Sequence, residues 1–295
     1  IGRGTKGARP MTREQAEALF GAILDGNVPD MELGAILLAL RIKGEASEEL
    51  LGFKHALDAR TRQVDAPDGP RTVILPTYNG ARKQANLMPL VALLLAREGI
   101  PVLIQGRHDF ETRVSPFKLL DALDIHPQTS LASASLALAE HKLACLRLDM
   151  LARGLDWLLS LRLRLGVRNS GHTLAKLLDP CRGRSVRCVA VTHPAFMESL
   201  QAFLLEERAR ALLMRGTEGE PYAAPRRRPR MLGFLKGQSE VLFDQAEFDQ
   251  AETDGEGCRV EDNAALIRHM LAGEVATPQA ILDQVRALAS LATRD

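Results

Sequence analysis

The architecture is indicated most clearly by residues 72 to 104, which read TVILPTYNGARKQANLMPLVALLLAREGIPVLI. This stretch contains an apolar, β-branched run at 72–75, a helical segment at 87–97 and a second apolar run at 101–104. Short apolar runs that alternate with helices predict a largely parallel sheet with helices on both faces. Later runs continue the series at 143–146, 186–191 and 211–214. We therefore predict an α/β domain with a mainly parallel central sheet.

A parallel sheet also predicts where its ligands bind. In such folds the ligand lies beyond the carboxyl ends of the strands, where the loops that follow neighbouring strands meet. The candidate site is therefore formed by the loops after Leu75, Ile104, Val191 and Met214.

The residues before this stretch predict a small helical domain. Thr12-Arg-Glu-Gln15 has the spacing of a capping box and precedes apolar residues at helical period. Further helices are expected from Asp30, ending at Gly44, and after a cap at Ser47. The turn-forming residues 65–70 end this domain. We predict a flexible basic arm at 1–10, a helical domain at 11–66 and the α/β domain at 71–295.

The composition is that of an ordinary globular protein. Of the 295 residues, 46% are hydrophobic and 25% are charged, which is not the balance of a disordered chain. The sequence holds no apolar run of the roughly 20 residues that a membrane helix needs, and residues 1–10 lack the apolar middle of a secretion signal. We expect a cytoplasmic protein without membrane contact.

The cysteines do not indicate a metal or disulfide framework. None of the four has C-x-x-C spacing, so we expect unpaired thiols at Cys145, Cys181, Cys188 and Cys258.

The net charge of +1 conceals a separation of charge along the chain. Arginines and lysines gather between residues 82 and 230, whereas the stretch from Glu240 to Asp262 is almost purely acidic. Such a separation favours a directed surface field. The simpler interpretation of any one arginine is a solvated helix face or a surface ion pair.

Several motifs occur in an order typical of one family. They are Met11-Thr-Arg-Glu-Gln-Ala-Glu-Ala-Leu-Phe20, Ala39-Leu-Arg-Ile-Lys-Gly-Glu45, Gly106-Arg107, Leu119-Leu-Asp-Ala-Leu-Asp-Ile125 and Leu165-Gly-Val-Arg-Asn-Ser-Gly-His-Thr-Leu-Ala-Lys-Leu-Leu-Asp-Pro180. Over nearly the whole chain the pattern resembles anthranilate phosphoribosyltransferase and its relatives in glycosyl transferase family 3. The resemblance implies a helical domain, a nucleoside phosphorylase/phosphoribosyltransferase-like α/β domain, and a homodimer joined through the helices. Those enzymes transfer ribose phosphate from phosphoribosyl pyrophosphate to an amine with the help of Mg²⁺.

The loop that would cradle the diphosphate is altered. The family's Gly-Thr-Gly-Gly-Asp falls on Pro76-Thr-Tyr-Asn-Gly80, where only Thr77 is retained. Proline has no N–H to give, and side chains at Tyr78 and Asn79 obstruct the close backbone approach that glycine permits.

The other parts of that site are also reduced. The family's Asn-x-Ser-Thr keeps Asn86 but loses both hydroxyls, and its metal-binding Asp-Glu pair falls on Glu220-Pro221, which keeps one carboxylate. The resemblance implies a degenerate phosphoribosyl pyrophosphate site, which consists of Thr77, Tyr78, Asn79, Gly80, Asn86, Gly106 and Glu220. We expect no catalytic residue, no metal and no cofactor there.

With these substitutions and the segment Gly166-Val-Arg-Asn-Ser-Gly-His172, the chain resembles the YbiB-type relatives of the transferase. Those relatives bind nucleic acid with little sequence preference. This resemblance implies DNA or RNA as the partner, held by its phosphates in a basic groove in the cleft between the domains. The residues expected to make the contacts are Arg82, Lys83, Arg107, Arg113, Lys118, Arg162, Arg164, Arg168, Arg226, Arg227, Arg228 and Arg230.

Two alternatives remain. A diverged, Mg²⁺-dependent phosphoribosyltransferase with another acceptor would use Asn86, Arg107, Arg162 and His172, although a lone histidine more often satisfies a helix end or a core hydrogen bond. A dimeric scaffold would bind a protein through the acidic stretch Glu240–Asp262, which is otherwise a solvated loop. Aromatic residues make up only 4% of the chain, which supplies few platforms for stacking bases.

Overall fold

The computed structural model describes residues 1–3, 7–108, 112–193, 195–248 and 259–294. Contacts between residues divide the chain into two units, one formed by residues 1–63 and 148–180, the other by residues 64–147 and 181–295. We call the first the helical unit and the second the α/β unit.

The helical unit contains the capping box predicted at Thr12. The Thr12 hydroxyl accepts a hydrogen bond from the Gln15 N–H (3.3 Å), and the Gln15 side chain accepts one from the Thr12 N–H (3.1 Å). The N-terminal helices are α2 (Arg13–Leu24), α3 (Asp30–Lys43) and α4 (Ser47–Asp58), which confirms the three predicted helices. One detail differs, because Ala46 rather than Ser47 is the N-cap of α4.

A second segment of the helical unit corrects the predicted domain boundaries, which placed residues 148–180 in the α/β domain. The chain returns to the helical unit as α8 (Leu148–Leu151), α9 (Arg153–Ser160), α10 (Arg162–Leu165), α11 (Gly171–Leu174) and the short helix η1 (Ala175–Leu177). Helix α9 approaches α2 so closely that a Cβ atom on Gly154 would lie 2.1 Å from the Leu24 carbonyl oxygen. In sequence these short helices look like a crossover between two strands. Only their packing on α2 and α4 shows that they belong to the helical unit.

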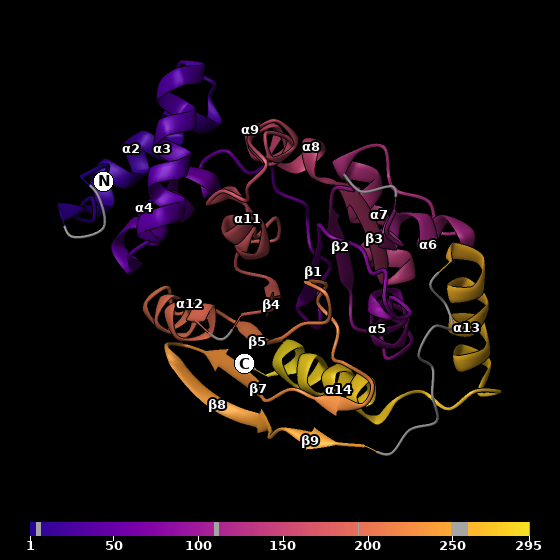
Figure 1. Cartoon of the computed structure of the whole chain (residues 1–295). Helices are drawn as coiled ribbons and strands as arrows, with labels where there is room; N and C mark the ends of the chain where they lie inside the picture. Colours follow the sequence, from indigo (N-terminus) through magenta and orange to yellow (C-terminus); the bar gives the residue numbers. More distant parts are fainter. Residues whose placement is uncertain (4–6, 109–111, 194, 249–258, 295) are drawn as a thin grey trace. The chain divides into compact units, whose positions relative to one another are not determined.

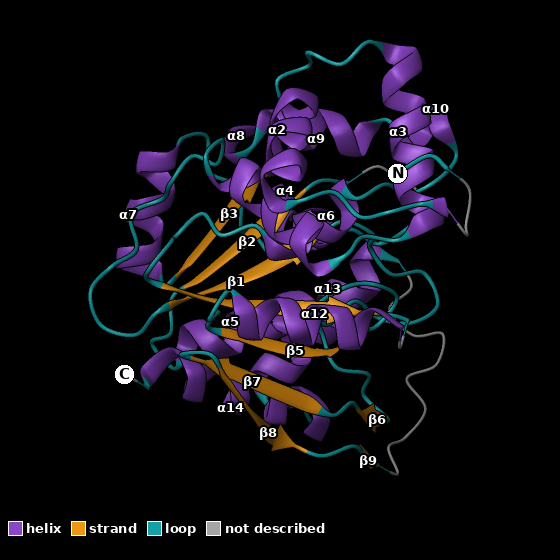
Figure 2. Ribbon diagram, turned by 90° about the vertical axis from the view of Figure 1, so that its left-hand side faces the viewer, coloured by secondary structure: helices purple, strands orange, loops and turns teal. Residues whose placement is uncertain are grey.

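The α/β unit is built on a seven-stranded sheet with the order β3-β2-β1-β4-β5-β7-β8 (Figure 2). The strands are β1 (Thr72–Thr77), β2 (Val102–Gly106), β3 (Leu143–Arg147), β4 (Ser185–Val191), β5 (Ala211–Arg215), β7 (Met231–Leu235) and β8 (Gln238–Phe243). The first five run parallel and confirm the predicted strands, whereas β7 pairs antiparallel with β5, and β8 pairs antiparallel with β7. The order of the strands reverses between β1 and β4, because β2 and β3 lie beyond β1 while β5 lies beyond β4.

One face of the sheet packs against α5 (Met88–Arg97), α13 (Val260–Ala272) and α14 (Gln279–Thr293) (Figure 1). Pairs of alternate strand residues contribute to this core, as Val73 and Leu75 do in β1, because successive side chains of a strand point to opposite faces. The remaining helices are α6 (Pro116–Ala122), α7 (Leu131–His141) and α12 (Ala195–Glu206). Among the helices described here, none is long and apolar enough to cross a membrane.

Candidate functional site

The loop that follows β1 encloses a carboxylate from a distant part of the chain. One oxygen of Glu220 accepts hydrogen bonds from the backbone N–H groups of Asn79 (2.9 Å), Gly80 (2.9 Å) and Tyr78 (3.3 Å). The other accepts a hydrogen bond from the Thr77 hydroxyl (2.7 Å), and Glu220 is fully buried. Successive N–H groups that converge on one point form an anion-binding concavity. The anion in this concavity is Glu220.

This geometry tests whether a magnesium-bound diphosphate, which the family resemblance implies, fits the residues present. The backbone N–H groups that would hold a diphosphate already donate to Glu220, and the Thr77 hydroxyl donates to its second oxygen, so a diphosphate would have to displace this carboxylate. The next residue is Pro221, which brings no second carboxylate. Across the described residues no group of three His, Cys, Asp or Glu side chains is placed to hold a metal ion. The residues therefore do not fit that group.

Close packing fixes this loop. A Cβ atom on Gly219 would lie 2.0 Å from the Asn79 side-chain nitrogen, and one on Gly106 would lie 1.8 Å from the Thr77 carbonyl oxygen. The retained Asn86 also has a local task, because its side chain accepts a hydrogen bond from the Met88 N–H at the start of α5 and donates one to the Val114 carbonyl (3.2 Å each). The loop residues of the predicted degenerate site and Glu220 are thus bonded to one another, whereas the Asn86 side chain bonds Met88 and Val114.

A second glutamate holds the next part of the loop. Glu218 accepts hydrogen bonds from the backbone N–H groups of Lys83 (2.9 Å) and Arg82 (3.2 Å), whose side chains are exposed. Nearby, Arg113 donates to the Gly80 carbonyl (3.3 Å). Of the other two predicted cations in this part of the chain, Arg107 is half-buried directly after β2 and Lys118 is exposed on α6. The loop therefore presents the side chains of Arg82 and Lys83 to solvent while Glu218 binds their backbone.

The arginines at 226–230 do not all face solvent. Arg226, Arg227 and Arg230 are exposed, but the side chain of Arg228 is only 17% exposed. Its guanidinium group pairs with Asp283 of α14 and lies over the rings of Phe243 and Phe248, at 5.2 and 5.6 Å from their centroids. Arg228, predicted to contact nucleic acid, is instead an anchor for α14.

In the folded chain, some of the basic residues pair with residues of the acidic stretch, although the two groups are separate in the sequence. The short strands β6 (Arg227–Arg228) and β9 (Ala246–Glu247) pair so that Arg227 lies opposite Glu247. Exposed ion pairs join Arg227 to Glu247 (3.5 Å) and Arg230 to Asp244 (3.6 Å). Exposed pairs contribute little energy, so these arginines can exchange partners readily. Residues 249–258 of the acidic stretch, which include Cys258, lie outside the described residues.

In the helical unit, positive charges surround His172. Burial, followed by the charges of Arg168 and Arg162, lowers the pKa of His172 to about 3, so its ring is neutral at physiological pH. Its Nδ1 accepts a hydrogen bond from the Asn169 N–H (3.3 Å), as expected of a histidine that satisfies a helix end. Arg164, in contrast, forms an exposed ion pair with Asp30 (3.2 Å). Arg162 and Arg168 are thus brought together, and Arg164 has a different neighbour.

The described cysteines give no sign of a reactive thiol. Cys145, Cys181 and Cys188 are buried and form no disulfide. Burial raises the pKa of the Cys145 thiol, and it raises that of Cys188 to about 12. Thiols with raised pKa values are poor nucleophiles at neutral pH.

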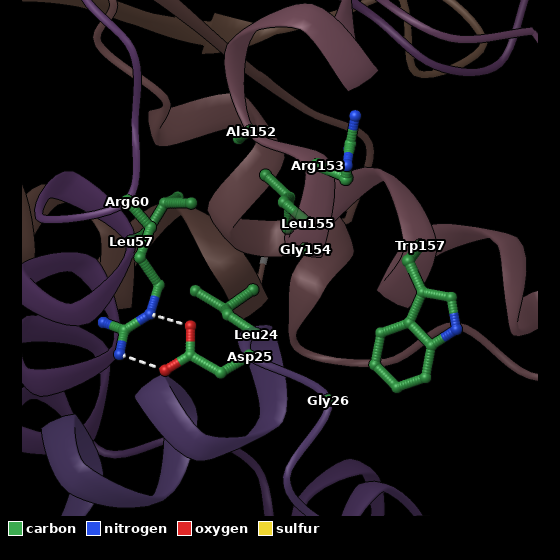
Figure 3. A pocket seen from close by; sticks show the side chains of 10 residues that line it. All are labelled: Leu24, Asp25, Gly26, Leu57, Arg60, Ala152, Arg153, Gly154, Leu155 and Trp157. Atoms are coloured by element: carbon green, nitrogen blue, oxygen red, sulfur yellow. Dashed lines mark hydrogen bonds and ion pairs between the residues drawn. The ribbon is translucent and has the colours of Figure 1, made fainter.

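A cavity lies in each unit. That of the helical unit has a volume of about 590 Å³ and is lined by Leu24, Leu57, Leu155 and Trp157, together with Asp25 and Arg60 (Figure 3). Arg60 donates two hydrogen bonds to Asp25 (2.7 and 2.6 Å), so these charges satisfy each other. None of the predicted site residues lines it, and its walls offer little chemistry.

The cavity of the α/β unit has a volume of about 460 Å³ and lies at the carboxyl ends of β4 and β5. It is lined by residues that follow three strands, Gln84 after β1, Thr192 and His193 after β4, and Gly216 to Glu218 after β5. The loops expected to form a site after Val191 and Met214 therefore do meet. Sequence reasoning missed Arg215, Glu218 and the cavity itself, and the only signal available was their position at strand ends.

Comparison with known proteins agrees with this architecture. A family model described as the glycosyl transferase family helical bundle domain matches residues 2–61. The crystal structure of anthranilate phosphoribosyltransferase from Thermus thermophilus superposes with a TM-score of 0.77 over 96% of this chain and 85% of that chain, at 24% identity. The anthranilate phosphoribosyltransferase of Rhizobium meliloti is 28% identical over 66% of this chain and 57% of its own length.

These matches define the class as glycosyl transferase family proteins with the anthranilate phosphoribosyltransferase fold. Within that class, YbiB of Escherichia coli is 39% identical over 287 residues, which cover 97% of this chain and 90% of YbiB. The chain belongs to the YbiB family.

Proposed function

We propose that this protein binds nucleic acid through the phosphate backbone, with little preference for sequence and without catalysis. The observation that carries the proposal is the carboxylate of Glu220 in the loop after β1, with exposed cations directly beside it at Arg82 and Lys83. Glu220 takes the donors that a diphosphate substrate would need. The cations nearby remain available to a polyanion.

Phosphate contacts account for affinity of this type. Each phosphate that a lysine or arginine neutralises releases counterions, which gives binding that is strong at low salt and independent of sequence. The proposed track in the α/β unit consists of Arg82, Lys83, Arg107, Arg113, Lys118, Arg226, Arg227 and Arg230, and the helical unit offers Arg162, Arg164 and Arg168. A partner of this kind agrees with the cytoplasmic location expected from the sequence.

The salt dependence of binding tests this proposal. With about six phosphate contacts, affinity for a labelled single strand should fall by roughly a thousandfold between low and moderate salt. Fluorescence anisotropy over a salt series measures the slope, and DNA, RNA and duplex probes of mixed sequence should give similar slopes. A salt-insensitive affinity, or binding confined to one sequence, would argue against backbone recognition.

A second candidate is a diverged Mg²⁺-dependent phosphoribosyltransferase with another acceptor. The enzymes of this name among the relatives favour it, whereas the bonded Glu220 and the lone carboxylate before Pro221 oppose it. Calorimetry with phosphoribosyl pyrophosphate and Mg²⁺ separates the two candidates. We expect no heat of binding, and a magnesium-dependent micromolar affinity would favour the enzyme instead.

We also propose that the protein forms a homodimer through the helical unit. Helix α3 carries a stripe of exposed apolar side chains at Met31, Leu38 and Ile42, with exposed fractions of 84%, 49% and 64%. Spacings of seven and four residues put these side chains on one face of the helix. Exposed Leu163 and Val167 belong to the same unit, and a second copy with the same stripe would cover such a surface.

Charges on this stripe should prevent the dimer. The double variant Leu38→Glu and Ile42→Glu is expected to halve the mass measured by light scattering, because carboxylates would be buried against each other at a two-fold interface. Both positions are exposed in the single chain, so the thermal stability of the monomer should change little. A wild-type chain that is monomeric at all concentrations would refute the proposal, as would an unchanged dimer in the variant.

A further inference from the structure

The cavity of the α/β unit lies where the topology favours a ligand. Open sheets bind ligands beyond the carboxyl ends of their strands, close to the point where the strand order reverses. In this sheet the order reverses between β1 and β4, and the cavity is lined by Gln84 after β1 and by Thr192 after β4. Its volume of about 460 Å³ is that of a small-molecule site.

The cavity wall carries more basic than acidic side chains. Arg215, Arg227 and Arg230 line it, against one acidic residue, Glu218. The carboxylate of Glu218 already accepts hydrogen bonds from the backbone of Arg82 and Lys83.

Among these cations Arg215 differs in having no competing partner. Within the part of the chain that the structure describes, the side chain of Arg215 forms no hydrogen bond or ion pair, and it is exposed at the end of β5. Arg227 and Arg230 have acidic neighbours, but at 3.5 and 3.6 Å in exposed pairs. An anion in the cavity would therefore find one unengaged guanidinium group and two that exchange readily.

The rest of the wall suits a ring system with polar edges. Val191, Met197, Ala224 and Pro229 give an apolar surface, and Gln84, Thr192 and Gln245 give amide and hydroxyl groups beside it. A largely apolar wall with a few polar groups that fix orientation is the usual composition of a ligand site.

We propose that this cavity binds a single nucleotide, with its phosphate on Arg215 and its base against the apolar wall. The inference rests on the proposed function, since a protein that holds nucleic acid by its phosphates would have use for a site that takes one nucleotide unit. A nucleoside monophosphate and the phosphorylated end of a strand share this chemistry. The site is separate from the loop that Glu220 occupies.

Binding measurements with two kinds of probe test the site. The free probes are AMP and UMP, measured by calorimetry, and the strand probes are one short oligonucleotide with and without a terminal phosphate. Arg215→Gln should weaken the phosphorylated probe by about tenfold or more, because a charge-assisted hydrogen bond is lost. Arg153→Gln, which changes an exposed arginine of the helical unit, is the matched control and should leave every affinity unchanged.

A second variant tests the apolar wall. Ala224→Phe should fill the cavity and abolish binding of AMP without changing the overall content of secondary structure. If AMP or UMP binds and Arg215→Gln weakens that binding, the ligand of the cavity is a free nucleotide. If only the oligonucleotide gains affinity from its terminal phosphate, and Arg215→Gln removes that gain, the ligand is the end of a strand.

Either of those results supports the site. The proposal is overturned if neither probe depends on Arg215, or if Ala224→Phe binds AMP as well as the wild type does. Salt-dependent binding of a long, unphosphorylated strand should persist in Arg215→Gln. If the wild-type protein does not bind such a strand at all, the result counts against the proposed function instead. The two failures can therefore be told apart.

Discussion

Replacing Arg226, Arg227 and Arg230 together by glutamate should weaken binding to every nucleic-acid sequence by about a hundredfold or more at low salt. The change removes three exposed cations of the proposed track and puts repulsive charges in their place. Because each lost phosphate contact removes about 0.7 to 0.9 from the slope of log affinity against log salt, the slope should shrink by roughly two to three. Anisotropy titrations at several salt concentrations measure both quantities.

A matched variant separates local contacts from net charge. Arg153→Glu, Arg182→Glu and Arg208→Glu alter the same number of exposed arginines outside the track, so the total charge changes equally. This control should retain most of the affinity. Arg228 is left unchanged in both variants, because its pairing with the buried Asp283 would make any loss of binding ambiguous. Equal losses in the two triple variants would mean that only net charge matters and that the track is not a site.

Glu220→Ala should lower the free energy of unfolding by about 3–5 kcal/mol. The variant leaves the Thr77 hydroxyl and the backbone N–H groups of Asn79 and Gly80 pointing into a buried space without an acceptor. The same vacancy should attract external anions. Inorganic phosphate should therefore raise the melting temperature of the variant and leave that of the wild type nearly unchanged.

Glu218→Ala provides the comparison for this experiment. Glu218 also accepts backbone hydrogen bonds, but it is half-buried, so water can replace the lost carboxylate and the cost should be about 1 kcal/mol. Its melting temperature should not respond to phosphate. If Glu220→Ala is as stable as the wild type, or if phosphate fails to stabilise the variant, then the loop's N–H groups do not form an anion-binding site that Glu220 fills.

Local chemistry made much of the fold predictable. The capping box at Thr12 and the glycine at Gly44 define helix ends through contacts within a few residues, and the apolar runs at 72–75 and 186–191 are buried strands. Sequence reasoning missed β7 and β8. The residues of β8 are exposed or half-buried, so they lack the apolar alternation that marks a strand.

The site was harder to predict because its contacts are distant in sequence. Glu220 was recognised as the one carboxylate that remains of a metal-binding pair, but its hydrogen bonds reach Asn79, 141 residues away. In the same way, sequence alone could not distinguish Arg228 from Arg227. Arg228 pairs with the buried Asp283 of α14, 55 residues further on, whereas Arg227 forms an exposed pair with Glu247.

The divided course of the helical unit has a consequence for biosynthesis. Helix α2 ends 129 residues before α9 begins (Leu24 to Arg153), and α4 ends 113 residues before α11 begins (Asp58 to Gly171), although each pair packs together. At about 5 to 20 residues per second, several seconds pass during which Leu24 and its neighbours lack their cover. In this interval the nascent chain exposes apolar side chains that α9 and α11 later cover, which makes the first helices candidates for chaperone contact. For the same reason, residues 1–63 are a poor choice for expression as an isolated fragment.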